Sequence, residues 1–123
     1  MRIDHKADAG MIATLRKQGA RGPWLQLLAA VLELAGGKAE FIRHTERPWS
    51  SVTFSGSRHI IALRFSGHEA IEAGETFIEA LPDHEFTIPR QLVADAAITS
   101  ADHALKDGPV LTLEAELLLL EEN

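Results

Sequence analysis

The stretch "IRHTERPWSSVTFSGSRHI", residues 42 to 60, decides how the middle of this chain folds. Within it, "SGSR" places Gly56 first in a two-residue turn, and glycine at that position is typical of a type II′ β-hairpin. In the register that this turn sets, Phe54 faces His59, and the apolar side chains alternate onto one face. The stretch therefore predicts a hairpin with one face in the core and the other face polar.

Two helices are expected before this hairpin. Asp8 can cap a short helix over residues 8–18. Pro23 suits the first position of a second helix because its ring fixes φ and its missing N–H is not needed there. Apolar residues then recur at i, i+3 and i+4 until Gly36 ends the helix. This second helix is expected to lie in the core.

A third helix and further strands complete an α+β layout. In "SGHE", Ser66 and Glu69 have the spacing of a capping box, and Pro82 ends the helix that follows. We expect an antiparallel sheet of five to six strands with two or three helices packed on one face, in the order α-α-β-β-β-α-β-β-β. Residues 1–7 are expected to be a flexible leader, and residues 8–123 a single domain. The predicted strands cover residues 39–46, 50–55, 58–65, 84–88, 91–99 and 109–120.

Composition and charge narrow the class of protein. The chain has 123 residues, a net charge of −6 and no cysteine, which excludes disulfides and thiolate metal sites. Residues 1–64 hold ten Lys or Arg against five acids, whereas residues 65–123 hold two against thirteen. The acidic total disfavours nucleic acid as a partner, although the basic half keeps it as a hypothesis. No segment approaches the ~20 apolar residues of a membrane span, so a cytoplasmic protein with no membrane partner is expected.

The polar face of the predicted hairpin is the candidate binding surface. Arginine holds phosphates and carboxylates through paired hydrogen bonds, and an indole nearby can act as a stacking platform. A solvated sheet surface is the alternative for the polar residues, and a lid over the edge of the core is the alternative for the tryptophan. The candidate residues for a ligand or partner are His44, Trp49, Thr53, Arg58 and Arg64.

Metal and catalytic chemistry have fewer candidates. His68 and Glu72 share one helical face at i and i+4, but a metal site needs three or four ligands, so no metal is expected. Asp95 is the candidate general base, because "LVADAAI" surrounds it with apolar residues that can raise a carboxyl pKa. An ion pair with an arginine is the alternative for Asp95. The chain has no phosphate-binding or dinucleotide motif, and no cofactor is expected.

These observations favour a small, non-catalytic protein-interaction or binding module. The carboxyl-terminal "TLEAELLLLEE" is apolar on both faces of a strand, which requires a central strand or a partner that covers it, and a homodimer is expected. The first alternative is a small cofactor-free enzyme that acts on an anionic substrate. The second is nucleic-acid binding through the basic amino-terminal half. Whether the protein is an enzyme stays open at this point.

Overall fold

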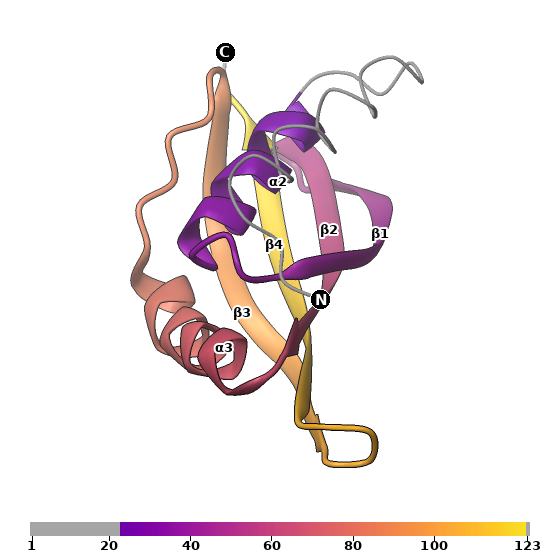
Figure 1. The fold of residues 1–123 in the computed structure, drawn as a ribbon. Coiled ribbons are helices and arrows are strands. Elements are labelled where there is room, and N and C mark those ends of the chain that lie inside the picture. Colours follow the sequence, from indigo (N-terminus) through magenta and orange to yellow (C-terminus); the bar gives the residue numbers. More distant parts are fainter. Residues whose placement is uncertain (1–22, 123) are drawn as a thin grey trace.

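A computed structural model of the chain describes residues 23–122 (Figure 1). The predicted leader over residues 1–7 and the predicted helix over residues 8–18 lie outside the described residues. The described elements follow the order α-β-β-α-β-β, with one short 3₁₀ turn. They are α2 (Pro23–Leu34), β1 (Glu40–Ser50), β2 (Ser55–Ser66), α3 (His68–Ala80), η1 (Leu81–Asp83), β3 (Gln91–Ala104) and β4 (Val110–Glu121).

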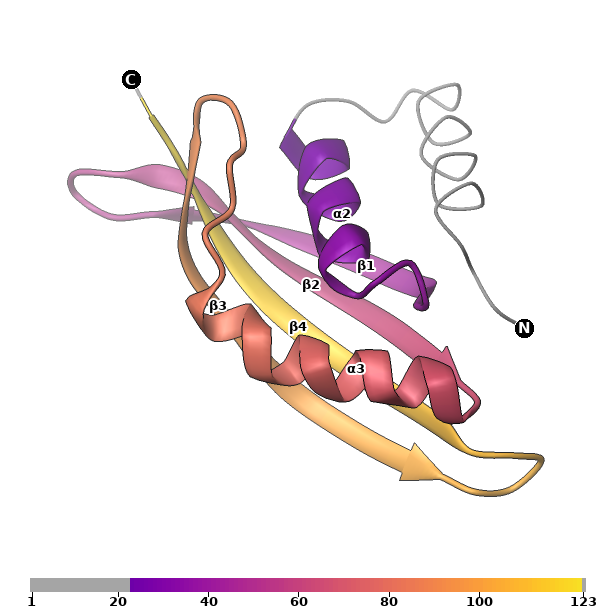
Figure 2. The ribbon, with the colours of Figure 1, turned by 60° about the vertical axis from the view of Figure 1, so that its left-hand side comes forward.

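The four strands form one antiparallel sheet in the order β1-β2-β4-β3, and both described helices pack on the same face (Figure 2). The prediction of an α+β fold with helices on one face is confirmed. The predicted five to six strands and the order α-α-β-β-β-α-β-β-β were wrong. The predicted strand 39–46 continues to Ser50 as β1, most of the predicted strand 50–55 forms the turn before β2, and the predicted strand 84–88 does not join the sheet.

The predicted turn at Gly56 was wrong, because the chain turns at residues 51–54. There the Ser51 N–H donates to the Phe54 carbonyl over 2.7 Å. The Ser51 hydroxyl also accepts the N–H of Thr53 at 3.3 Å and that of Phe54 at 3.0 Å. Serine side chains often organise turns in this way. Gly56 instead pairs with Trp49 within the ladder, where a Cβ would collide with the Leu119 carbonyl oxygen.

The segment between α3 and β3 is extended but does not form the predicted strand. Ile88 is buried and bridges Gln91 alone, across a tight turn at Pro89 and Arg90. Arg90 has φ of 65°, a conformation that non-glycine residues seldom adopt. Proline has no N–H for a ladder, so pairing stops at this turn. β3 then runs to Ala104, past the predicted end at residue 99, because β4 pairs with it throughout.

The start of α3 also differs from the prediction. Ser66 is the last residue of β2, and Gly67, with φ of 90°, precedes the helix without any side-chain cap. The predicted capping box of Ser66 and Glu69 was therefore wrong. The chain leaves the sheet so abruptly that only a residue tolerant of positive φ fits before His68.

The core lies between the two described helices and the sheet. β4 is central in the sheet, as a strand apolar on both faces requires. α3 approaches the sheet closely at Gly74, where an added Cβ would lie 2.8 Å from Leu111. None of the described helices is long and apolar enough to cross a membrane. The largest fully buried side chains are Leu27, Leu28, Leu32, Ile61, Leu63, Phe65, Phe77, Leu81, Leu111, Leu113, Leu117 and Leu119.

Candidate functional site

The sheet face away from the helices, called the open face below, carries a row of ion pairs. The guanidinium of Arg43 donates to the Glu114 carboxylate over 2.6 Å, and the buried Ala62 lies between their strands. Arg64 pairs with Glu40 at 3.0 Å. The remaining pair joins Arg58 to Glu116 at 3.7 Å. Two of these three pairs join the basic amino-terminal half of the sequence to the acidic carboxyl-terminal half, and Arg64–Glu40 lies within the basic half.

The five residues predicted for a single binding surface do not all come together. Arg58, Arg64 and Trp49 lie on the open face. Thr53 is in the β1–β2 turn, and His44 is on the opposite, helix-covered face. The cause is a β-bulge between Phe41 and Arg43, which shifts the alternation of β1 by one residue. A strand without the bulge would place Arg43 inward and His44 outward, as the sequence suggested.

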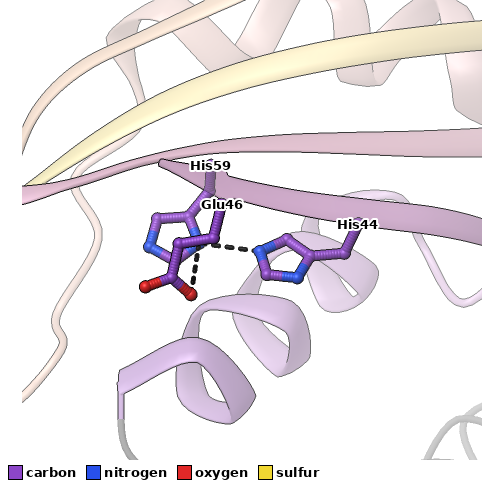
Figure 3. Close-up of side chains that lie close together, drawn as sticks. All are labelled: His44, Glu46 and His59. Atoms are coloured by element: carbon purple, nitrogen blue, oxygen red, sulfur yellow. Dashed lines mark hydrogen bonds and ion pairs between the residues drawn. The ribbon is translucent and has the colours of Figure 1, made fainter. Parts of the chain in front are cut away.

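The displaced His44 belongs to a polar cluster under the amino-terminal end of α2. His44 and Glu46 are alternate residues of β1, and Glu46 lies opposite His59 of β2 (Figure 3). Their side chains point to the same side of the sheet. The Trp24 indole of α2 stacks on the His44 ring, with centroids 3.6 Å apart and planes 8° apart. His59 is only 2% exposed.

Hydrogen bonds link both histidines of this cluster. His44 Nε2 and His59 Nδ1 are 2.8 Å apart, and His59 Nε2 is 2.7 Å from the Ser57 hydroxyl. The Glu46 carboxylate lies 3.9 Å from His59 Nδ1. Each ring nitrogen of His59 therefore has a partner, as a buried polar group requires.

Burial keeps both imidazoles neutral near pH 7. Loss of hydration, with the neighbouring His59 ring as a smaller cause, lowers the pKa of His44 from 6.5 to about 4. Burial also lowers the pKa of His59, and the Glu46 carboxylate opposes that shift without cancelling it. Two neutral imidazoles and one carboxylate make a set of donor atoms suited to a cation.

The Ser57, His59 and Glu46 succession resembles the order of groups in a nucleophilic triad, but its surroundings do not suit one. The adjoining cavity is only about 90 Å³ and is lined by Pro23, Trp24 and the three polar residues themselves. Substrate pockets commonly have ~300 Å³ or more. The cavity has room for a solvent molecule and not for an organic substrate.

A larger hollow lies at the end of the sheet where the β1–β2 turn meets the start of β3 and the end of β4. It has a volume of about 370 Å³, and we call it the hairpin-tip groove. Phe54 and Leu92 are each 49% exposed there, and Leu120 forms part of its wall. Its full lining is Thr53, Phe54, Ser55, Leu92, Leu120, Glu121 and Glu122.

The remaining predicted site residues are exposed and lie apart from these features. Asp95 is exposed on the edge strand β3 and does not line the hollows described above. His68 and Glu72 are exposed on α3. A third hollow of about 480 Å³ lies between α2 and residues 84–87, and its lining includes Leu34 and Phe86.

Comparisons with known proteins add a likeness of fold. No family model and no curated protein matches the chain. A solved chain described as "Virion of native gene transfer agent (GTA) particle" resembles it with a TM-score of 0.54 and 16% sequence identity. The match covers 79% of this chain and 90% of that chain. At this identity the likeness shows the fold alone.

Of the polar cluster, the sequence singled out only His44, and Trp24, Glu46, Ser57 and His59 were missed. The "HTE" spacing at residues 44–46 does place a histidine and a glutamate on one face of a strand. His59 can be recognised as the neighbour of His44 and Glu46 only if the turn is placed at residues 51–54. Gly56 instead suggested a turn at residues 56–57.

Proposed function

We propose that this chain is a non-catalytic subunit of a protein particle, and that it assembles with further copies of itself through the hairpin-tip groove. The observation that carries the proposal is the convergence of two half-exposed apolar side chains, Phe54 and Leu92, on one groove. They come from segments far apart in the sequence. Exposed apolar groups that gather in this way mark interaction surfaces more often than isolated ones do.

The charges beside the groove favour a second copy as the occupant. The Glu122 N–H donates to the Arg90 carbonyl over 3.0 Å, so a basic and an acidic residue are neighbours at this rim. Neither side chain has an ion-pair partner among the residues that the structure describes. A two-fold contact brings the same patch of both subunits together, so Arg90 of one copy can meet Glu122 of the other.

The fold supports a role in a particle. The solved chain with the same fold is described as belonging to a gene transfer agent virion, and the likeness extends over most of both chains. Folds host many functions, so this support stands beside the groove and does not replace it. Cytoplasmic localisation, expected from the sequence, stays a prediction.

The open face around Arg58 and Arg64 contributes less to this contact in our proposal. Both guanidiniums already have carboxylate partners within the sheet, at 3.7 Å for Arg58 and 3.0 Å for Arg64. A new partner would have to replace those ion pairs. We therefore expect Arg58→Ala to leave self-association within about twofold of the wild type, because exposed ion pairs contribute little.

Sedimentation velocity over a range of protein concentrations tests the proposal. We expect wild-type chains to form a discrete oligomer, and Leu92→Asp to weaken its formation at least ~10-fold, because a carboxylate would be buried in the contact. Leu105→Asp is the matched control, because Leu105 is 81% exposed near the turn at the opposite end of the sheet. A wild type that stays monomeric at all concentrations, or equal losses in both variants, would contradict the proposal.

A further inference from the structure

We propose that His44, Glu46 and His59 form a binding site for a late first-row divalent metal ion such as Zn²⁺, at the junction of β1, β2 and α2. Imidazole nitrogen together with a carboxylate oxygen is a donor set typical of zinc. This inference does not depend on self-assembly, and either proposal can fail without the other.

The donor atoms already converge. One donor atom from each of the three residues lies within 4.8 Å of the other two. His59 Nδ1 is the meeting point, 2.8 Å from His44 Nε2 and 3.9 Å from the Glu46 carboxylate (Figure 3). Bonds of about 2 Å to a tetrahedral ion hold donor atoms roughly 3.3 Å apart. Side-chain shifts of less than about 1 Å would therefore admit the ion, since these separations lie on both sides of that value.

The surroundings of the ligands fit a metal site as well. With His59 Nδ1 bound to the ion, its Nε2–H would donate to the Ser57 hydroxyl, which is already 2.7 Å away. Ligand histidines commonly use their second nitrogen in this way, which holds the ring in place. Trp24 fixes the His44 ring by stacking on it from α2. Both imidazoles are thus held in position before any ion binds.

A fourth ligand position has room beside the cluster. The cavity of about 90 Å³ is lined by Glu46, Ser57 and His59, together with Pro23 and Trp24. A water molecule occupies about 30 Å³ in the liquid, so the cavity has room for at least one. Three protein ligands with a solvent-filled fourth position is the pattern of zinc sites that stay open.

A second pair of possible metal ligands in the same chain provides the control. The spacing of His68 and Glu72 on α3 is what the sequence suggested for a metal, and both are exposed. Each substitution in the proposed site therefore has a counterpart in the other pair, with the same change of residue type. His44→Ala is matched by His68→Ala, and Glu46→Gln is matched by Glu72→Gln.

Calorimetric titration of the full chain with ZnCl₂, after removal of metals by chelation, tests the proposal. We expect one site per chain, weakened at least ~10-fold by His44→Ala and by Glu46→Gln but unchanged by His68→Ala and Glu72→Gln. MgCl₂ should not bind there, since magnesium prefers oxygen ligands in octahedral geometry. Absence of zinc binding by the wild type, or binding lost through His68→Ala instead, would overturn the proposal. Circular dichroism verifies that each variant is folded.

Tryptophan fluorescence provides a second measurement that locates the ion. Co²⁺ bound at the cluster would quench Trp24, which stacks on a ligand, whereas Trp49 lies on the open face. In Trp49→Phe, which keeps Trp24, we expect saturable quenching by Co²⁺ that His44→Ala abolishes. In Trp24→Phe we expect a much smaller change. Quenching confined to Trp49, or no quenching in either variant, would contradict the site.

Discussion

The two faces of the β1–β2 pair use polar residues in opposite ways. On the helix-covered face, His44 and His59 lose most of their contact with water. Their rings stack, and they form hydrogen bonds with each other and with Ser57. On the open face, Arg43 and Arg64 pair with carboxylates that remain in contact with water. The difference indicates that substitutions in the covered-face cluster should lower the free energy of unfolding much more than substitutions of the open-face ion pairs.

The largest effect on stability is expected from His59→Ala. Its removal leaves the His44 ring and the Ser57 hydroxyl without their partner and opens a cavity beside Trp24. We expect a loss of about 2–4 kcal/mol in the free energy of unfolding, measured by urea denaturation. His103→Ala, at an exposed position of β3, is the control and should cost less than about 0.5 kcal/mol. Similar losses in the two variants would show that the buried cluster stabilises the fold no more than an exposed histidine does.

A smaller effect is expected from acidification of the metal-free protein. The pKa of His44 is about 4 in the folded chain and 6.5 when unfolded, so the unfolded chain binds more protons between these values. The stabilisation of the folded chain by the neutral His44 is complete above pH 6.5 and is lost as the pH falls towards 4. His59 acts in the same direction, with Glu46 opposing. Between pH 7 and pH 5 we expect a loss on the order of 1 kcal/mol, since His44 keeps part of its hydration.

Urea denaturation at several pH values measures this slope. Most carboxylates stay ionised above pH 5, so the window reports mainly on histidine. His44→Gln should flatten the slope, whereas His84→Gln, which changes an exposed histidine, should not. A stability that rises on acidification over this window would show that the cluster prefers the protonated state.

The smallest effect is expected from the ion pairs of the open face. Arg43→Ala should change the free energy of unfolding by less than about 1 kcal/mol, even though its guanidinium lies 2.6 Å from the Glu114 carboxylate. Part of the loss should come from uncovering Ala62. Added NaCl should reduce the difference between wild type and variant. A loss as large as that of His59→Ala would mean that the open face also holds the fold together.

The sequence predicted the elements whose patterns are local. Apolar residues repeat with helical spacing after Pro23, which placed a core helix there. β4 is apolar on both faces, which placed it as a central strand. Sequence-based prediction was wrong where the local sequence allows two conformations. Ser51 and Gly56 can each make a turn, and a single bulge after Phe41 exchanges the directions of Arg43 and His44. The neighbours of His44 in the polar cluster could therefore be identified only from the pairing of the strands.

Site-specific cross-linking tests the central claim, that chains meet at the hairpin-tip groove, most directly. The chain has no cysteine, so Thr53→Cys and Leu105→Cys each introduce a single point for a photoactivated maleimide label. We predict a covalent dimer from the label at residue 53 and little from the label at residue 105. Dimers formed equally from both positions, or from residue 105 alone, would contradict it.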